Sequence, residues 1–175
     1  MMKQFWIGLR LFLWLTLITG VIYPLAITGV ANILFFEKAQ GSIIVRDGKK
    51  IGSKFIAQKF SEEKYFWPRP SANDYNALKS SGSNLSPSSL RLKEVMQKRA
   101  AAYAEKEVPP ALLFASGSGL DPDISLYAAY FQVDRVAKAR GINPEEVKEL
   151  IEKLRTYSYV NVLELNLALD ERFKK

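Results

Sequence analysis

Two residue types are missing from this chain altogether: its 175 residues include no cysteine and no histidine. Without cysteine the chain has no disulfide, no thiolate nucleophile and no thiolate-bound iron–sulfur site. Without histidine it cannot supply a Ser–His–Asp triad, a zinc-protease helix or a histidine general base. The motifs G-x-x-x-x-G-K-[ST], G-x-G-x-x-G and G-x-S-x-G are also absent from the sequence. We therefore expect no catalytic residue, metal site or cofactor site within this chain.

Charged residues are missing from one long stretch, between Arg10 and Glu37. As a helix rising about 1.5 Å per residue, residues 11–36 would cross a hydrocarbon core of about 30 Å. In hydrocarbon a lone apolar segment satisfies its backbone hydrogen bonds only as a helix. The alternatives are a buried core helix and a cleaved signal peptide, although a signal h-region of about 7–15 residues is shorter. We expect a short N-terminus over residues 1–10, a transmembrane helix over 11–36 and one domain over 37–175.

Small and hydroxylated residues within the apolar stretch suggest a packing face. They recur at the i, i+3, i+4 and i+7 positions of a helix and would share one side of it. Such a side suits close helix–helix contact in lipid, although scattered tolerated residues are the alternative. Pro24 has no N–H for the carbonyl of Gly20, and a neighbouring helix or a hydroxyl can compensate for that loss. The residues expected in transmembrane packing are Thr16, Thr19, Gly20, Tyr23 and Pro24.

The sequence after residue 36 mixes strand and helix signals. Asp47-Gly48 is typical of a hairpin turn, and Pro87 is typical of a first helical position. Gly141 indicates a helix end, and Asn143 with Glu146 indicates a capping box. Because strand and helix signals alternate, we expect one mixed α/β domain. The expected elements are a hairpin over 42–58, an irregular stretch over 63–89, helices over about 86–105, over 126–140 and from 143 onward, and strands over 111–114 and 160–169.

The irregular stretch over residues 63–89 is long for a compact domain, and loops of that length are usually functional or disordered. Its aromatic residues argue against disorder. Rings beside Arg69 have the composition of a protein–protein hot spot. We expect a partner-binding loop, and burial of the rings against the loop's own domain is the alternative. The rings are those of Tyr65, Phe66, Trp67 and Tyr75.

A second loop, residues 115–123 with the sequence ASGSGLDPD, lies between an expected strand and an expected helix. Backbone N–H groups near Gly117 and Gly119 could cradle a small anion. The alternative is a tight turn in which Asp121 or Ser125 caps the next helix. A hydrolase that uses one of the loop's serines with a lysine base is a further hypothesis, because it needs no histidine.

The chain is basic, with a formal net charge of +7, but its basic residues are dispersed among acidic ones. This pattern indicates a solvated surface with some attraction to anionic headgroups, and it argues against a nucleic-acid groove. Basic residues flank both ends of the apolar stretch, so a positive-inside count leaves the orientation of the span open.

Five strings follow the single span in a fixed order: RPSANDYN (69–76), SSGSNLSP (80–87), ASGSGLDPDIS (115–125), RVAKARG (135–141) and VNVLELNLALD (160–170). The string GSKFIAQKF (52–60) fits with them. In order and spacing they closely resemble the C subunit of the Kdp high-affinity potassium-transporting P-type ATPase, over nearly the whole chain. The chain departs from the usual pattern of that family at Ser81, Ser86, Ser89, Ala111 and Asp123.

The resemblance implies an accessory, non-pore subunit of an ATP-driven potassium uptake complex, needed for assembly and stability. The implied partners are a channel-like potassium-binding subunit, a phosphorylated P-type ATPase subunit and a very small single-span subunit. ATP and potassium would be handled by the complex, and the family is also described as aiding ATP binding by the pump or entry of the ion. The sequence lacks D-K-T-G-T, so the phosphorylated aspartate must belong to another subunit. The alternative function is a membrane-tethered extracytoplasmic domain that binds a small ligand.

The family's domain lies outside the cytoplasm, so the resemblance implies a single-pass protein of the cell membrane with residues 1–10 inside and 37–175 outside. We expect the loop over residues 65–84 and the turn over 116–121 to lie near each other and to form or support the surface that meets the channel-like subunit. The residues expected in that surface are Tyr65, Phe66, Arg69, Pro70, Ser71, Tyr75, Asn76, Ser83, Asn84, Ser116, Gly117, Ser118, Gly119 and Asp121.

Overall fold

A computed structural model describes residues 2–103 and 107–173 of the chain. The chain divides into two compact units, one up to Ile43 and one from Ile44 onward.

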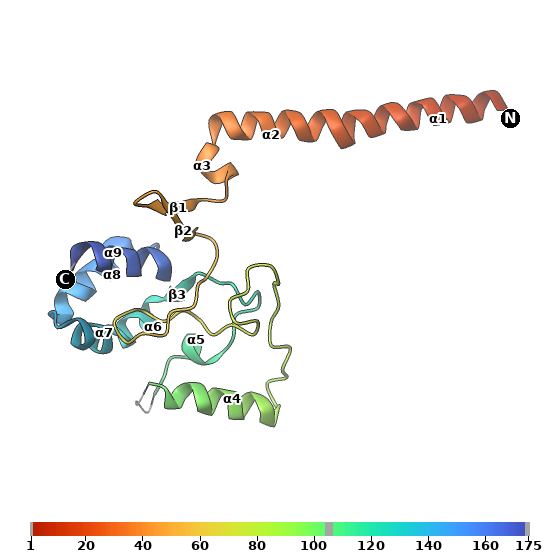
Figure 1. Cartoon of the computed structure of the whole chain (residues 1–175). Coiled ribbons are helices and arrows are strands. Elements are labelled where there is room, and N and C mark those ends of the chain that lie inside the picture. Colours follow the sequence, from red (N-terminus) through yellow and green to blue (C-terminus); the bar gives the residue numbers. More distant parts are fainter. Residues whose placement is uncertain (1, 104–106, 174–175) are drawn as a thin grey trace. The chain divides into compact units, whose positions relative to one another are not determined.

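The first unit is dominated by one continuous helix, made of α1 (Met2–Leu17), a π-helical turn η1 (Ile18–Ile22) and α2 (Tyr23–Leu34) (Figure 1). By its length of 33 residues and its apolar composition this helix can cross a membrane, and none of the span is buried by the rest of the chain. The helix starts before the expected residue 11, because Lys3 and Arg10 are good helix formers. It stops before the expected residue 36, because Phe35 leaves the helical region at φ −136°. A short helix α3 (Phe36–Ala39) follows.

The π-helical turn ends two residues before Pro24, the residue that cannot donate a hydrogen bond to Gly20. At the end of this turn the N–H of Tyr23 bonds to the carbonyl of Ile18, five residues back. A π turn holds more residues than an α turn. Tyr23 is therefore rotated away from the helix face that it would share with Thr16 and Gly20 if the spacing were α-helical throughout. The hydroxyl of Thr19 donates to the carbonyl of Leu15 at 2.7 Å, within its own helix.

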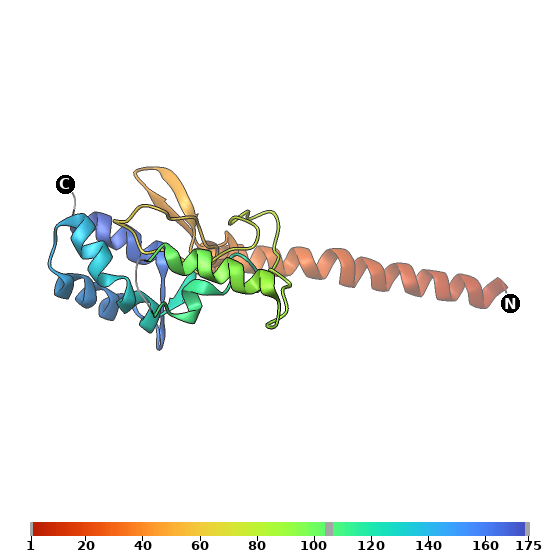
Figure 2. The same cartoon turned by 90° about the horizontal axis from the view of Figure 1, so that it is seen from below.

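The second unit begins with the hairpin expected around Asp47-Gly48. Strands β1 (Ile43–Arg46) and β2 (Lys49–Ser53) pair in a two-stranded sheet at the edge of the domain (Figure 2). The connecting residues have φ values of 50° and 73°, the conformation that favours Asp-Gly in a tight hairpin. The hairpin prediction is confirmed, but β2 ends at Ser53 and not near residue 58.

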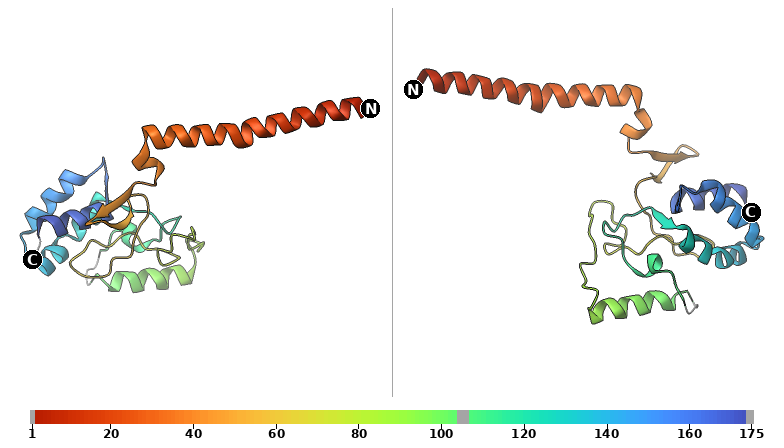
Figure 3. Two further views of the ribbon diagram at one scale, coloured as in Figure 1. Left: turned by 45° about the horizontal axis from the view of Figure 1, so that its top comes forward. Right: turned by 180° about the vertical axis from the view of Figure 1, so that it is seen from behind.

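Helices make up most of the remaining domain. At one end α8 (Pro144–Leu154) packs beside α9 (Val162–Arg172), and α4 (Leu90–Ala101) lies toward the other end next to α5 (Pro110–Leu113) (Figures 1 and 3). Between them run α6 (Leu126–Phe131) and α7 (Val133–Arg140). Strands β3 (Asp123–Ser125) and β4 (Tyr159–Asn161) pair antiparallel as a second two-stranded sheet. The mixed helix and strand domain is therefore confirmed.

The main core lies between the C-terminal helices and the β3–β4 ribbon. Its largest fully buried apolar side chains come from α5 to α9, the ribbon and one residue of the long loop. They are Phe66, Leu112, Ile124, Ile151, Leu163, Leu165, Leu169, Val133, Val136, Val147 and Val160.

Two expected strands are helices. Of residues 111–114, the first three fall in α5 and Phe114 is its extended C-cap, because Pro110 stands in the first turn with φ already suited to a helix. The expected strand over 160–169 is the short β4 followed by α9, which starts where the Asn161 side chain accepts the N–H of Glu164 at 3.1 Å. Five residues of α9 are buried, so its apolar pattern is too broad to separate a buried helix from a buried strand. Strand β3 was not expected from the sequence.

Two helices have limits that differ from those expected from the sequence. The helix expected from residue 86 begins at Leu90, because Ser89 acts as its cap and accepts the N–H of Leu92 at 3.4 Å. The expected end near residue 105 lies outside the described residues. The helix expected over 126–140 is interrupted at Gln132 (φ −91°, ψ −5°). The stop at Gly141, with φ 65°, and the capping box of Asn143 are confirmed.

Candidate functional site

The irregular segment over residues 62–70 is held in place by two buried side-chain amides. Asn166 Oδ1 accepts the N–H of Phe66 at 2.8 Å, and Asn166 Nδ2 donates to the carbonyl of Phe66 at 3.0 Å. Gln132 binds Trp67 in the same way: its Oε1 accepts the N–H of Trp67 at 2.8 Å, and its Nε2 donates to the carbonyl of Trp67 at 3.2 Å. Both amides are 1% exposed. Each amide therefore does for this backbone what a neighbouring strand would do in a sheet.

Arg135 of α7 adds a charged clamp to the same segment. It donates to the carbonyl of Glu63 at 2.6 Å and to the carbonyl of Tyr65 at 3.1 Å. Its guanidinium carbon lies 4.0 Å from the centre of the Trp67 ring, in cation–π contact. Burial lowers the pKa of Arg135 to about 10, so the group remains charged at neutral pH. The charge thus stabilises the segment through both carbonyl dipoles and an aromatic face.

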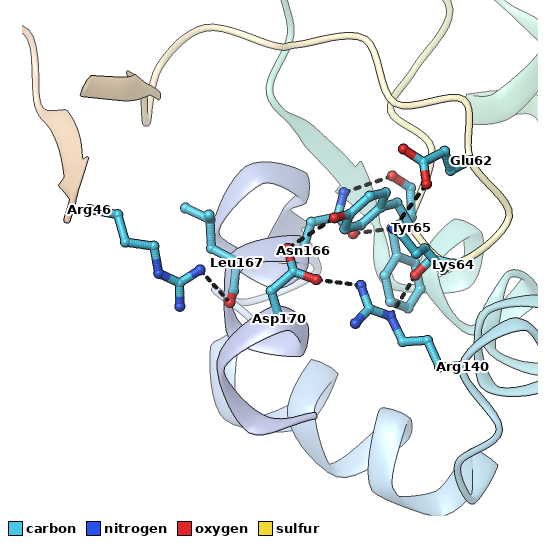
Figure 4. Close-up of polar contacts among 9 residues, drawn as sticks. Arg46, Glu62, Lys64, Tyr65, Arg140, Asn166, Leu167 and Asp170 are labelled. Atoms are coloured by element: carbon cyan, nitrogen blue, oxygen red, sulfur yellow. Dashed lines mark hydrogen bonds and ion pairs between the residues drawn. The ribbon is translucent and has the colours of Figure 1, made fainter. Parts of the chain in front are cut away.

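Arg140, Asp170 and Tyr65 form a second clamp (Figure 4). Asp170 accepts from Arg140 Nη2 at 2.8 Å and from the Tyr65 hydroxyl at 3.0 Å. Arg140 Nε donates to the carbonyl of Lys64 at 2.7 Å, and the Arg140 side chain is only 8% exposed. Burial and the hydrogen bond to Asp170 raise the pKa of Tyr65. Tyr65 is therefore a brace between the loop and helices α7 and α9.

The two loops singled out from the sequence touch each other, as expected. Arg69 Nη1 and Asp121 Oδ2 form an ion pair at 2.7 Å. The N–H of Ser81 bonds to the carbonyl of Ser118 at 2.9 Å. The N–H of Ser116 bonds to the carbonyl of Pro70 at 3.0 Å. The adjacency of the loops is thus confirmed, and it is maintained by backbone as well as side-chain bonds.

Close packing of the two loops explains why position 119 is a glycine. A Cβ on Gly119 would lie 2.7 Å from the carbonyl oxygen of Ser81 and 2.8 Å from Oδ1 of Asn73, and the residue has φ 72°. Tyr75 takes a left-handed conformation itself, with φ 58°, and its hydroxyl donates to the carbonyl of Arg69 at 2.9 Å. Burial raises the pKa of Tyr75 to about 12. The loops therefore have a fixed backbone conformation and not an adaptable one.

The predicted surface residues divide by exposure. Phe66, Ser116 and Gly119 are buried, so these residues are internal to the domain. Half-buried members brace the loops, and these are Tyr65, Arg69, Pro70, Ser71, Tyr75 and Asp121. The exposed members are Asn76, Ser83, Asn84, Gly117 and Ser118.

Sequence reasoning missed the side chains that hold the loop from below. Their only sequence signal is a polar residue within an otherwise apolar helical stripe, which indicates a buried hydrogen-bond partner. They are Gln132, Arg135, Arg140, Asn166 and Asp170.

The loop geometry gives no support to catalysis. Ser116 is 3% exposed, and among residues 2–103 and 107–173 no lysine hydrogen-bonds to Ser116 or Ser118. The N–H groups of Gly119 and Leu120 bond within the turn, at 3.3 and 3.1 Å, which leaves fewer donors for an anion. Across the described part of the chain no group of three or more aspartate or glutamate side chains could hold a metal ion. The two loops thus form a closely packed turn region held by backbone and side-chain hydrogen bonds.

Known proteins are similar in sequence to this chain along nearly its whole length. The family model described as "KdpC: K+-transporting ATPase, c chain" matches residues 5–171. The Potassium-transporting ATPase KdpC subunit of Rhodopseudomonas palustris (strain BisB5) is 45% identical over 201 residues, which cover 100% of both chains. The subunit of the same name from Bradyrhizobium diazoefficiens is 47% identical with the same coverage. The one from Leptospira interrogans is 46% identical over 180 residues, covering 95% of this chain and 93% of the relative.

These matches span most of the long N-terminal helix, both loops and the C-terminal helices that hold the loops. The chain therefore belongs to the KdpC family of potassium-transporting ATPase subunits.

Proposed function

We propose that this chain is the accessory, non-catalytic subunit of an ATP-driven potassium uptake complex, and that it acts in assembly and stability. The observation that carries the proposal is the family match over residues 5–171. One membrane helix cannot line an ion path, because a filter needs ligands from several segments. Ion conduction and phosphoryl transfer therefore fall to partner subunits.

The partners we propose are a channel-like potassium-binding subunit, a phosphorylated P-type ATPase subunit and a small single-span subunit. The loop surface would meet the channel-like subunit. Its fixed backbone supports this, since a rigid binding surface loses less conformational entropy on association. Leu78, at the tip of the same loop, is 93% exposed and supplies an apolar anchor of the kind that interfaces bury.

Co-purification tests the assembly role. The chain is co-expressed with its partner subunits, and the complex is captured in mild detergent through a tag on the channel-like subunit. Leu78→Ala should reduce the amount of this chain recovered, whereas Leu90→Ala, at a leucine that is 77% exposed and lies outside the two loops, should not. Failure of the wild-type chain to co-purify would contradict the function itself. Equal recovery of both variants would contradict only the assignment of the loop surface.

The proposed topology places the N-terminus in the cytoplasm and the domain outside. The chain has no cysteine, so each introduced cysteine is a unique label site. A membrane-impermeant maleimide should label Asp134→Cys on intact cells and Lys3→Cys only after permeabilisation. The reverse pattern would show the opposite orientation. A mature chain that lacks residues 2–34 would show that the helix is a cleaved signal.

A further inference from the structure

A polar hollow lies on the outer face of the β3–β4 ribbon. In the antiparallel register Asp123 faces Asn161, Ile124 faces Val160 and Ser125 faces Tyr159. Alternate residues of a strand point to opposite faces, so the buried Ile124–Val160 pair faces the core and the other two pairs lie on the opposite face. On that face Asn161 is itself buried and donates to the carbonyl of Lys54 at 2.8 Å. Above this outer face is a hollow of about 370 Å³, whose lining residues are Arg69, Ala111, Asp121, Asp123, Ile124, Ser125, Ser158 and Tyr159.

The hollow holds one carboxylate more than it holds cations. Arg69 is neutralised by Asp121, through the ion pair described above. Asp123 accepts one hydrogen bond from the neutral amide of Asn161 at 3.2 Å, and it takes part in none of the ion pairs of the described residues. Burial, followed by the nearby carboxylate of Asp121, raises the pKa of Asp123. The domain thus keeps a carboxylate where its charged form is disfavoured, which is common at functional sites.

One exposed tyrosine lines this hollow, and two more lie within two residues of its lining in the sequence. Tyr159 lines it and is 41% exposed, while Tyr127 and Tyr157 are 63% and 89% exposed. The backbone brings them together, because the N–H of Leu126 bonds to the carbonyl of Ser158 at 3.0 Å. Tyrosine is enriched at protein–protein interfaces, where it supplies contact area at a low cost in conformational entropy.

The turn that carries Tyr157 is strained. Thr156 and Tyr159 exchange two backbone hydrogen bonds, at 2.9 and 3.2 Å, around the two residues between them. The first of these residues is Tyr157, with φ 53°, a position that usually carries glycine in such a turn. The ring is 89% exposed, so packing within the domain does not explain why a bulky residue occupies this conformation.

We propose that the hollow and the three tyrosines together form a docking site for a lysine or arginine side chain of a partner polypeptide in the same complex. The cationic head would pair with Asp123 within the hollow, and the tyrosine rings would cover its aliphatic stem and provide cation–π contact. The inference rests on the proposed function, in that it requires a partner subunit, and the hollow shares Arg69 and Asp121 with the two loops.

Charge favours this occupant over a lipid surface. A lone carboxylate repels anionic headgroups, although the domain as a whole is basic. A protein side chain also explains the aromatic rim, which a small hydrated cation would not require.

The test separates contact from folding by its choice of variants. Tyr157→Gly removes the ring and relieves the positive φ, so the variant should unfold at the same temperature as the wild type or higher. Asp123→Asn keeps an acceptor for Asn161 and removes a charge that burial disfavours, so it should also keep its thermal stability at neutral pH. Asp134→Asn, at an exposed carboxylate on α7, is the matched control.

The readout is recovery of the chain with the detergent-purified complex as the salt concentration is raised. Tyr157→Gly and Asp123→Asn should each lower recovery at least threefold, and Asp123→Asn should flatten its salt dependence. Asp134→Asn should behave as the wild type. If the wild-type complex forms and both variants are recovered fully at every salt concentration, the docking site is refuted and the proposed function stands. If the wild-type complex does not form, the proposed function fails.

Photo-cross-linking identifies the occupant. With p-benzoylphenylalanine in place of Tyr157, ultraviolet light should join the chain to a partner peptide that contains lysine or arginine within a few residues of the link. Cross-links to lipid, to an acidic peptide or to no partner would overturn the proposal.

Discussion

Asn166 satisfies both backbone groups of a single residue, Phe66, with hydrogen bonds of 2.8 and 3.0 Å. The two residues are far apart in sequence, and both are fully buried. Together they attach an extended, proline-rich segment to helix α9 without any strand pairing. The long loop is therefore positioned by side chains of the C-terminal helices, of which Asn166 is one and Gln132 another.

Replacement of Asn166 should destabilise the domain strongly. In Asn166→Leu the buried N–H and carbonyl of Phe66 lose their partners, and each unsatisfied group costs about 1–3 kcal/mol. We expect the free energy of unfolding to fall by about 2–4 kcal/mol. Urea denaturation of the full chain in detergent can follow Trp67 fluorescence in a Trp6→Phe, Trp14→Phe background, since the chain has 3 tryptophans. Asn76→Asp, at an exposed loop position, should change the stability by less than about 0.5 kcal/mol. Equal stability of the two variants would contradict the role of the amide.

Structural features that depend on a few neighbouring residues were predicted correctly from the sequence. The Asp47-Gly48 hairpin, the Gly141 stop and the Asn143 capping box are visible in the sequence because each needs only a few neighbouring residues. The family motifs also indicated that the loops containing Arg69 and Asp121 lie together.

What the sequence did not reveal depends on tertiary burial. Residues 160–169 alternate like a strand, yet most of them form α9, because the core surrounds several sides of that helix. The amides of Gln132 and Asn166 gave no signal of their target, since the backbone that they bind lies at least 65 residues away. The buried side of the loop could therefore be predicted only as one of two alternatives.

A matched pair of glycines tests the packing of the two loops. Gly119→Ala places a Cβ against the carbonyl oxygen of Ser81 at a position with φ 72°, so we expect a loss of about 2 kcal/mol or more. Gly117→Ala meets nothing within 4 Å and should be neutral within about 0.5 kcal/mol. Thermal unfolding of both full-length variants measures the difference. Similar melting temperatures would show that the loops do not approach as closely as the structure describes.

Alkaline pH should unfold the domain partly through its buried tyrosines. Burial raises the pKa values of Tyr75 and Tyr103 to about 12, from 10.0 for an ordinary tyrosine. A raised folded-state pKa gives stability that is complete below pH 10 and is lost as the pH rises toward 12. Tyr103→Phe keeps the ring contacts with Trp67 and Phe131, whose centroids lie 5.1 and 5.7 Å away, and removes the ionising hydroxyl. Urea denaturation from pH 8 to about pH 12 should therefore show a shallower loss for this variant. Tyr127→Phe, at an exposed ring, should leave the slope unchanged, and an unchanged slope in Tyr103→Phe would contradict the assignment.

The membrane helix offers a test of packing that is independent of the domain. A Cβ on Gly20 would meet only Thr16 Cγ2, at 4.0 Å, so Gly20→Leu leaves the helix itself undisturbed. In lipid, small residues matter because they let another helix approach closely, and a leucine there would block that approach. We expect Gly20→Leu to reduce recovery of the chain with its complex after detergent extraction more than Leu17→Ala does, since the latter removes bulk instead of adding it. The π-helical turn over residues 18–22 contains Gly20, and because such turns are frequent at functional sites it strengthens the expectation that another helix covers this position. Equal recovery of both variants, with the helix still inserted, would show that Gly20 faces lipid and that the contact lies on another side of the helix.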